Sequence, residues 1–150
     1  MSAQIQVVGA AILDSLERPA RLLVARRTAP ERFAGLWEFP GGKVEAGEEC
    51  EDALHRELRE ELGVGVRLGH ELPAGTPAGW PLNARATMRV WQAEITEGEP
   101  HPLEDHDELR WVGVADHQTV LELPWIPADF PIVQALLDSL SARVLQARTP

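Results

Sequence analysis

The stretch of residues 42–64 constrains the fold of this chain more than any other part of the sequence. It begins in a pair of adjacent glycines and continues through a loop that is rich in glutamate. From about residue 49 to residue 62 it contains no glycine or proline, and residues of high helix propensity dominate. Gly63 follows directly, and glycine commonly ends a helix. The stretch therefore predicts a tight turn followed by a helix over residues 49–62.

The predicted helix has an acidic edge beside its buried stripe. Three leucines spaced four residues apart share one face, while Glu57, Glu60 and Glu61 occupy an adjoining arc at i, i+3 and i+4. Like charges this close repel one another, and a bound cation would offset the repulsion. Mg²⁺ prefers oxygen ligands and commonly takes one or two carboxylates together with substrate phosphates. The spacing predicts a Mg²⁺ site, with Mn²⁺ as the alternative ion. The competing interpretation is an exposed helix with weak surface ion pairs.

Residues that precede the helix, or lie on its other faces, complete this predicted site. Glu48 comes from the loop before the helix and can approach the same metal. Gly41 offers a carbonyl oxygen at a point where the backbone can pass close to a ligand, because glycine has no side chain. Arg56 is expected either to pair with Glu60 or to order the loop.

The whole stretch resembles the Nudix box, the signature of a family that hydrolyses nucleoside diphosphates linked to another group. The fixed positions of that pattern are filled here by Gly42, Glu48, Arg56, Glu57, Leu58, Glu60, Glu61, Gly63 and Val64. The preceding segment, residues 36–43 (Leu-Trp-Glu-Phe-Pro-Gly-Gly-Lys), is similar to the MutT branch of the family. The resemblance implies an α+β Nudix fold, a mixed β-sheet sandwiched between α-helices, in a single domain over residues 1–150.

The resemblance also implies a reaction, the Mg²⁺-dependent cleavage of a nucleoside triphosphate to monophosphate and pyrophosphate. In the MutT branch this activity removes 8-oxo-dGTP or related nucleotides from the pool. Divalent ions neutralise phosphate oxygens and lower the pKa of a bound water, and a carboxylate then takes the proton. Glu57 is the expected base, with Glu48 as the second candidate. The expected metal ligands are Gly41, Glu57, Glu60, Glu61 and Glu108.

Glu108 is assigned because MutT-like enzymes carry a metal-binding glutamate just before the strand expected here at residues 109–112. Asp105 and Asp107 compete for this role. His106 is interpreted as a loop histidine rather than a ligand, because Mg²⁺ favours oxygen.

Five residues are expected to bind the nucleotide by the same resemblance. They are Arg27, Phe39, Lys43, Arg85 and Asp129. Three of them also have an interpretation without a ligand. Arg27 would then be a solvated strand end, Phe39 a core residue, and Asp129 an acid at the start of the last helix. As a base reader, Asp129 can accept from the amino group of cytosine or from the N–H edge of guanine. A preference for (d)CTP is therefore an alternative to 8-oxo-dGTP.

Two further functions remain as rivals. One is the hydrolysis of ADP-ribose or of a dinucleoside polyphosphate, although no convincing set of residues for it stands beyond the box. The other is a non-catalytic nucleotide sensor on the same fold. Sensors usually lose acids of the box, and this chain retains all of them.

The composition of the chain limits which ligands it can bind and which compartment suits it. The formal net charge of −10 argues against a nucleic-acid polymer as partner, because phosphate backbones require a basic surface. The single cysteine, Cys50, excludes an intramolecular disulfide and fits a reducing compartment. The sequence shows no signal pattern and no apolar run that could span a bilayer. We expect a cytoplasmic protein, monomeric or homodimeric, that contacts no membrane.

The remaining elements follow from apolar periodicity and turn residues. Residues 5–13 are nearly all apolar and predict a strand buried on both faces. Residues 73–83 are rich in proline and glycine and predict a loop or wide hairpin, in which Trp80 either overhangs the ligand or staples the loop. Further strands are expected at residues 22–25, 64–71 and 85–95, a helical turn within residues 114–121, and a last helix over residues 132–147.

Overall fold

The computed structural model of the chain describes residues 4–148. Its strands are β1 (Ile5–Leu13), β2 (Arg21–Arg27), β3 (Trp37–Glu38), β4 (Gly41–Lys43), β5 (Gly65–Glu71), β6 (Trp80–Asn83), β7 (Ala86–Glu97) and β8 (His106–Gly113). Its helices are η1 (Glu31–Phe33), α1 (Cys50–Leu62), α2 (His117–Leu121), η2 (Pro127–Asp129) and α3 (Phe130–Arg148).

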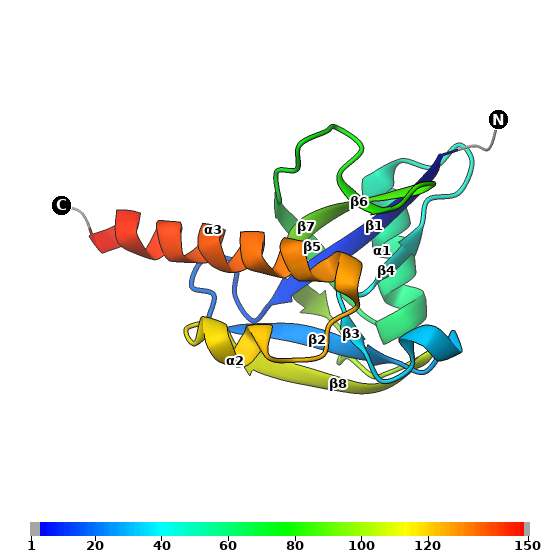
Figure 1. The fold of residues 1–150 in the computed structure, drawn as a ribbon. Coiled ribbons are helices and arrows are strands. Elements are labelled where there is room, and N and C mark those ends of the chain that lie inside the picture. The colour runs from blue at the N-terminus through cyan, green and yellow to red at the C-terminus, as the bar shows by residue number, and fades with distance from the viewer. Residues whose placement is uncertain (1–3, 149–150) are drawn as a thin grey trace.

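The strands form one mixed sheet. Its main path runs β3-β2-β1-β7-β5, while β4 pairs with β1, β6 with β7, and β8 with β2. β1 and β7 run parallel, and the other pairs are antiparallel. Helix α1 lies on one face of the sheet, and α2 and α3 lie on the other (Figure 1). This arrangement confirms the predicted α+β fold with a mixed sheet between helices.

Strand β1 shows why its sequence is apolar throughout. Ala11 and Leu13 pack into the cluster under α3, while Val8, Ala10 and Ile12 pack into the cluster under α1. Successive side chains point to opposite faces of a sheet, and here both faces are covered. The prediction of a strand buried on both faces is confirmed.

Helix α1 follows the prediction closely. It begins at Cys50 and ends at Leu62, and the next residue, Gly63, adopts φ +73° and donates its N–H to the carbonyl of Arg59. A left-handed residue at this position is favourable only for glycine and a few others. The leucine stripe at residues 54, 58 and 62 is fully buried against the sheet. The acidic residues lie on the edge that adjoins this stripe, and Glu61 among them is buried.

Residues 73–83 connect β5 to β7, which pair antiparallel, as in the wide hairpin that was one of the two predicted alternatives, but they are not loop throughout. Residues 80–83 belong to strand β6, because they pair with β7 at the edge of the sheet, where a proline such as Pro81 is tolerated. Trp80 is half-buried and packs against the cluster under α3. Strand β8 begins at His106 rather than at residue 109, because its pairing with β2 extends to Arg27.

Within the described residues, no helix is both long and apolar enough to cross a membrane.

Candidate active site

The acidic edge of α1 holds three glutamates at different depths. Glu61 is buried, Glu57 is largely covered, and Glu60 is half-exposed. The Oε2 atom of Glu61 has no hydrogen-bond partner among the described residues. A buried carboxylate oxygen without a partner is costly, so it calls for a ligand or a proton.

The electrostatics of Glu61 indicate which ligand would suit it. Burial, together with the charges of Glu38 and Glu57, raises the pKa of Glu61 to about 9, and the N–H of Gly41 directed at this carboxylate partly offsets the rise. A divalent cation beside Glu61 would reverse this balance by favouring the ionised carboxylate. The donors here are carboxylate oxygens, which suit a hard ion such as Mg²⁺ or Mn²⁺. The residues present therefore fit a divalent metal.

The glycine pair of β4 permits the close packing of this site. A Cβ atom at Gly42 would lie 2.3 Å from Cδ of Glu57, and one at Gly41 would lie 1.9 Å from the carbonyl oxygen of Val8. Both contacts are much shorter than real side chains allow. Glycine at these positions lets the β4 backbone lie directly against Glu57 and strand β1.

Arg56 ties the loop before α1 to the acidic edge. Its Nε and Nη2 atoms donate to the carboxylate of Glu48 at 2.9 and 3.0 Å, and Nη2 also donates to the carbonyl of Lys43 at 3.0 Å. Its Nη1 donates to Glu57 at 2.9 Å and to Glu60 at 3.3 Å. Arg56 therefore both pairs with Glu60 and orders the loop. Its hydrogen bonds to Glu48 lower the pKa of that carboxyl to about 2.

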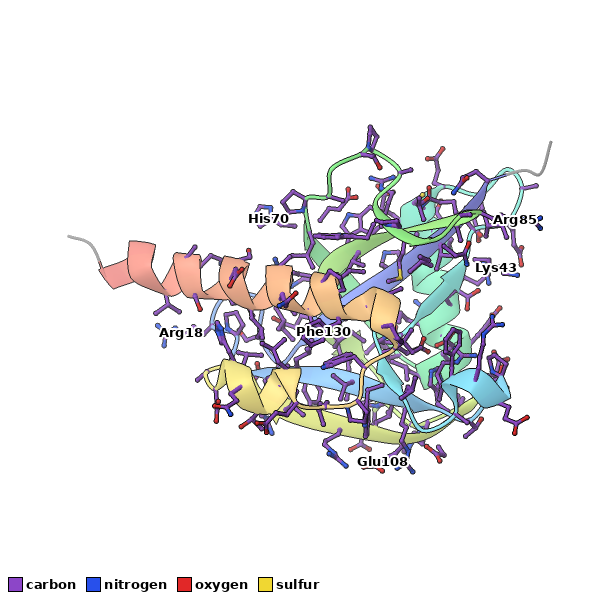
Figure 2. All side chains as sticks on the ribbon, in the orientation of Figure 1. Arg18, Lys43, His70, Arg85, Glu108 and Phe130 are labelled. Carbon is purple, nitrogen blue, oxygen red and sulfur yellow. The ribbon has the colours of Figure 1, made fainter. Side chains whose placement is uncertain are left out.

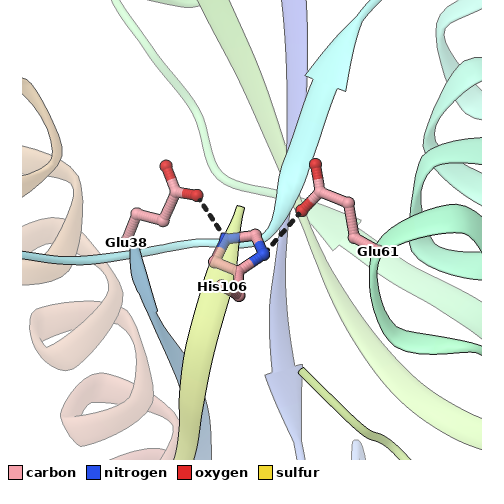
Figure 3. A group of neighbouring side chains, drawn as sticks. All are labelled: Glu38, Glu61 and His106. Carbon is pink, nitrogen blue, oxygen red and sulfur yellow. Dashed lines mark hydrogen bonds and ion pairs between the residues drawn. The ribbon is translucent and has the colours of Figure 1, made fainter. Parts of the chain in front are cut away.

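A second polar group lies beside Glu61 and was not predicted from the sequence. Oε2 of Glu38 accepts from Nη1 of Arg27 at 2.9 Å and lies 2.8 Å from Nε2 of His106. Figure 3 shows the His106 ring between the carboxylates of Glu38 and Glu61. The expectation that His106 lies in a loop is wrong, because it begins strand β8 and its side chain is buried.

Asp129 lies near enough to Glu38 to feel its charge. It is buried, and its Oδ2 accepts from the backbone N–H of Phe39 at 3.1 Å. Burial and the charge of Glu38 raise the pKa of Asp129 to about 7. The side chain thus bonds across the fold to the segment between β3 and β4.

Residues 38–42 form a continuous segment that meets most of the candidate residues in turn. Along it, Glu38 contacts Arg27 and His106, Phe39 contacts Asp129, Gly41 faces Glu61, and Gly42 abuts Glu57. A short stretch of backbone thereby connects the acidic edge of α1 with Asp129.

The structure does not bring Glu108 into this group. The register between β2 and β8 shifts at Arg26 and Arg27, so that His106 lies opposite Arg27 while Glu108 lies opposite Arg26. Glu108 forms ion pairs with Arg26 at 3.4 Å and with Arg110 at 3.0 Å. Its competitor Asp105 lies closer to the group, 3.9 Å from Nη2 of Arg27.

The other expected nucleotide contacts are more dispersed. The side chain of Phe39 is in the core, where its ring centroid lies 5.7 Å from that of Trp125. Lys43, on β4, and Arg85, in the turn between β6 and β7, are exposed at the surface (Figure 2). No short-range signal in the sequence indicates that Glu38 and His106 meet, since 68 positions separate them.

The acidic edge of α1, packed against the glycine pair of β4, is the arrangement that the Nudix box predicts. The model of the NUDIX domain matches residues 4–136 of the chain. The chain therefore belongs to the Nudix family, and it is a hydrolase of that family.

Its relatives place it in the MutT-like branch. A Mycobacterium tuberculosis protein, provisionally named 8-oxo-dGTP diphosphatase 2, is 41% identical over 131 residues, which cover 86% of this chain and 84% of that protein. The Escherichia coli CTP pyrophosphohydrolase is 36% identical over 140 residues, covering 93% and 96% of the two chains. Among solved structures, a MutT Nudix hydrolase from Burkholderia pseudomallei is similar with a TM-score of 0.72 and 28% identity, covering 89% of this chain and 98% of that one.

Proposed function

We propose that this protein hydrolyses nucleoside triphosphates to monophosphate and pyrophosphate, with 8-oxo-dGTP or a related (d)NTP as substrate. The observation that carries the proposal is the unpartnered Oε2 of Glu61 beside Glu57, at the edge of a complete Nudix box. The names of the relatives support a nucleoside triphosphate as the substrate. We propose that the residues used below lie within a single domain. We expect the protein to act in the cytoplasm, either as a monomer or as a homodimer.

Glu57, Glu60 and Glu61 would hold Mg²⁺, or Mn²⁺ in its place. When bound, the ion neutralises phosphate charge and acidifies a water molecule. Arg56 donates to Oε1 of Glu57 and so helps to fix the orientation of that carboxylate. We assign Glu57 as the general base, because Glu48, with a pKa of about 2, is a weak base. Glu48 instead holds Arg56 in place. We propose that the carbonyl of Gly41 contacts the metal. Phosphate or base contacts are proposed for the three basic residues Arg27, Lys43 and Arg85.

Asp129 would read the base. Its Oδ2 is occupied by the N–H of Phe39, so Oδ1 remains for a donor on the nucleotide. An ionised aspartate accepts from the N–H edge of guanine or from the amino group of cytosine. The second candidate is therefore a preference for (d)CTP, which is supported by the match over 96% of the Escherichia coli CTP pyrophosphohydrolase.

The test is a panel of nucleotides that includes 8-oxo-dGTP, dGTP, dCTP and ADP-ribose, with Mg²⁺ present and with pyrophosphate and phosphate resolved. We expect release of pyrophosphate from a triphosphate and little turnover of ADP-ribose. Glu57→Gln should lower kcat by a factor of about a hundred or more while the fold persists, because the base is lost.

The matched control is Glu51→Gln, an exposed acid in the first turn of the same helix, which should retain wild-type kcat. Faster hydrolysis of ADP-ribose than of every triphosphate would overturn the proposal. Unchanged turnover in Glu57→Gln would remove Glu57 from the mechanism.

A further inference from the structure

The His106 ring is surrounded by hydrogen-bond acceptors. Its side chain is fully buried, with Nε2 2.8 Å from Oε2 of Glu38. Its Nδ1 lies 3.3 Å from the carbonyl oxygen of Leu103 and 3.7 Å from Oε2 of Glu61. Carbonyl and ionised carboxylate oxygens only accept, so when both glutamates are ionised each ring nitrogen faces groups toward which it can donate.

This geometry differs from that of a metal ligand. The ligand atoms of Glu38, Glu61 and His106 lie within 4.8 Å of one another, as they would around an ion. However, the ring stands between the two carboxylates, with one nitrogen directed at each (Figure 3). A histidine ligand must present a lone pair to the metal. Nε2 is engaged with Glu38, and Nδ1 faces the carbonyl oxygen of Leu103 and Oε2 of Glu61, so each nitrogen is directed at an oxygen of the protein. The ring therefore separates and orients the carboxylates.

The position of the ring is fixed relative to α1. The N–H of Leu103 donates to the backbone carbonyl of Glu61 at 3.0 Å, which joins the segment before β8 to the end of the helix. Arg27 donates to the same oxygen of Glu38 that contacts the ring. The ring cannot shift without breaking contacts to two elements.

We propose that His106 is a positioning residue for Glu61, holding this carboxylate in the orientation in which it binds the divalent ion. The inference rests on the proposed function, in which Glu61 is a metal ligand. Without the ring, the carboxylate of Glu61 loses the group that lies between it and Glu38, and its orientation is no longer fixed from the side of β8. Groups that orient metal ligands typically contribute 10- to 100-fold to metal affinity.

The experiment measures Mn²⁺ binding to the free enzyme by electron paramagnetic resonance, with no nucleotide present. The proteins are wild type, His106→Asn and the matched control His101→Asn, an exposed histidine in the segment just before β8. We expect His106→Asn to bind Mn²⁺ about 10- to 100-fold more weakly and His101→Asn to match wild type. We also expect the kcat/KM of His106→Asn to recover in part as the Mg²⁺ concentration rises.

Thermal melting distinguishes a positioning role from a purely structural one. A folded His106→Asn variant with wild-type Mn²⁺ affinity overturns the inference, even where its melting temperature falls. His106→Gln supplies a second variant if asparagine prevents folding; its longer amide retains a donor and should bind Mn²⁺ more tightly than a variant without one, His106→Leu. Equal affinity in these two variants also overturns the inference. If wild type itself binds no Mn²⁺, the proposed function falls instead.

Discussion

Replacing Asp129 with asparagine should remove a pH-dependent loss of stability from the native protein. Asparagine has nearly the same shape, and its carbonyl oxygen can accept the N–H of Phe39 in place of Oδ2. The substitution removes the ionisable proton and replaces Oδ1 with an amide nitrogen. Any change in how stability depends on pH then reports on the carboxyl group of Asp129.

The sign follows from linkage. Folding raises the pKa of Asp129 from 3.8 to about 7, so the folded protein binds the proton more tightly than the unfolded chain does. The resulting stabilisation is fully present below about pH 4 and is lost as the pH rises to about 7. At 1.36 kcal/mol for each pH step, the whole change is about 4 kcal/mol, of which about 3 kcal/mol falls between pH 5 and pH 8.

The assay is urea unfolding of wild type and Asp129→Asn at several pH values from 5 to 8, with a chelator present. The stability of the variant relative to wild type should rise by about 3 kcal/mol over this range. Asp138→Asn, at an exposed position on α3, is the control and should follow wild type at every pH. Parallel curves for wild type and Asp129→Asn would refute the reasoning.

Two further predictions test the packing around the site. Gly42→Ala should lower kcat about a hundredfold, because the new Cβ displaces the Glu57 carboxylate, while Gly75→Ala, where no atom lies within 4 Å, should leave kcat unchanged. Steady-state kinetics with circular dichroism measures both, and wild-type kcat in Gly42→Ala would show that the close contact is not needed. Leu58→Ala should lower the free energy of unfolding by about 2–5 kcal/mol, because the side chain of Leu58 is fully buried between α1 and the sheet. Urea unfolding measures this, and a loss below about 1 kcal/mol would contradict the observed burial.

Local periodicity was sufficient for the elements whose burial repeats along the chain. β1 is apolar at nearly every position because both of its faces are covered, and α1 shows its leucine stripe and the glycine that follows it, Gly63, in the sequence. β6 could not be recognised in the same way. Its residues form a strand only because β7 lies beside them, and their local composition is that of a loop.

The sequence by itself determined the acidic edge of α1, because residues three and four apart must share one side of a helix. It did not determine what faces that edge. A one-residue shift between β2 and β8 places His106, rather than Asp107, opposite Arg27, and the place of Asp129 depends on a hydrogen bond across the fold to Phe39. Spacing along the chain specifies neighbours within one element, whereas contacts between elements depend on register and packing, which only the tertiary structure decides.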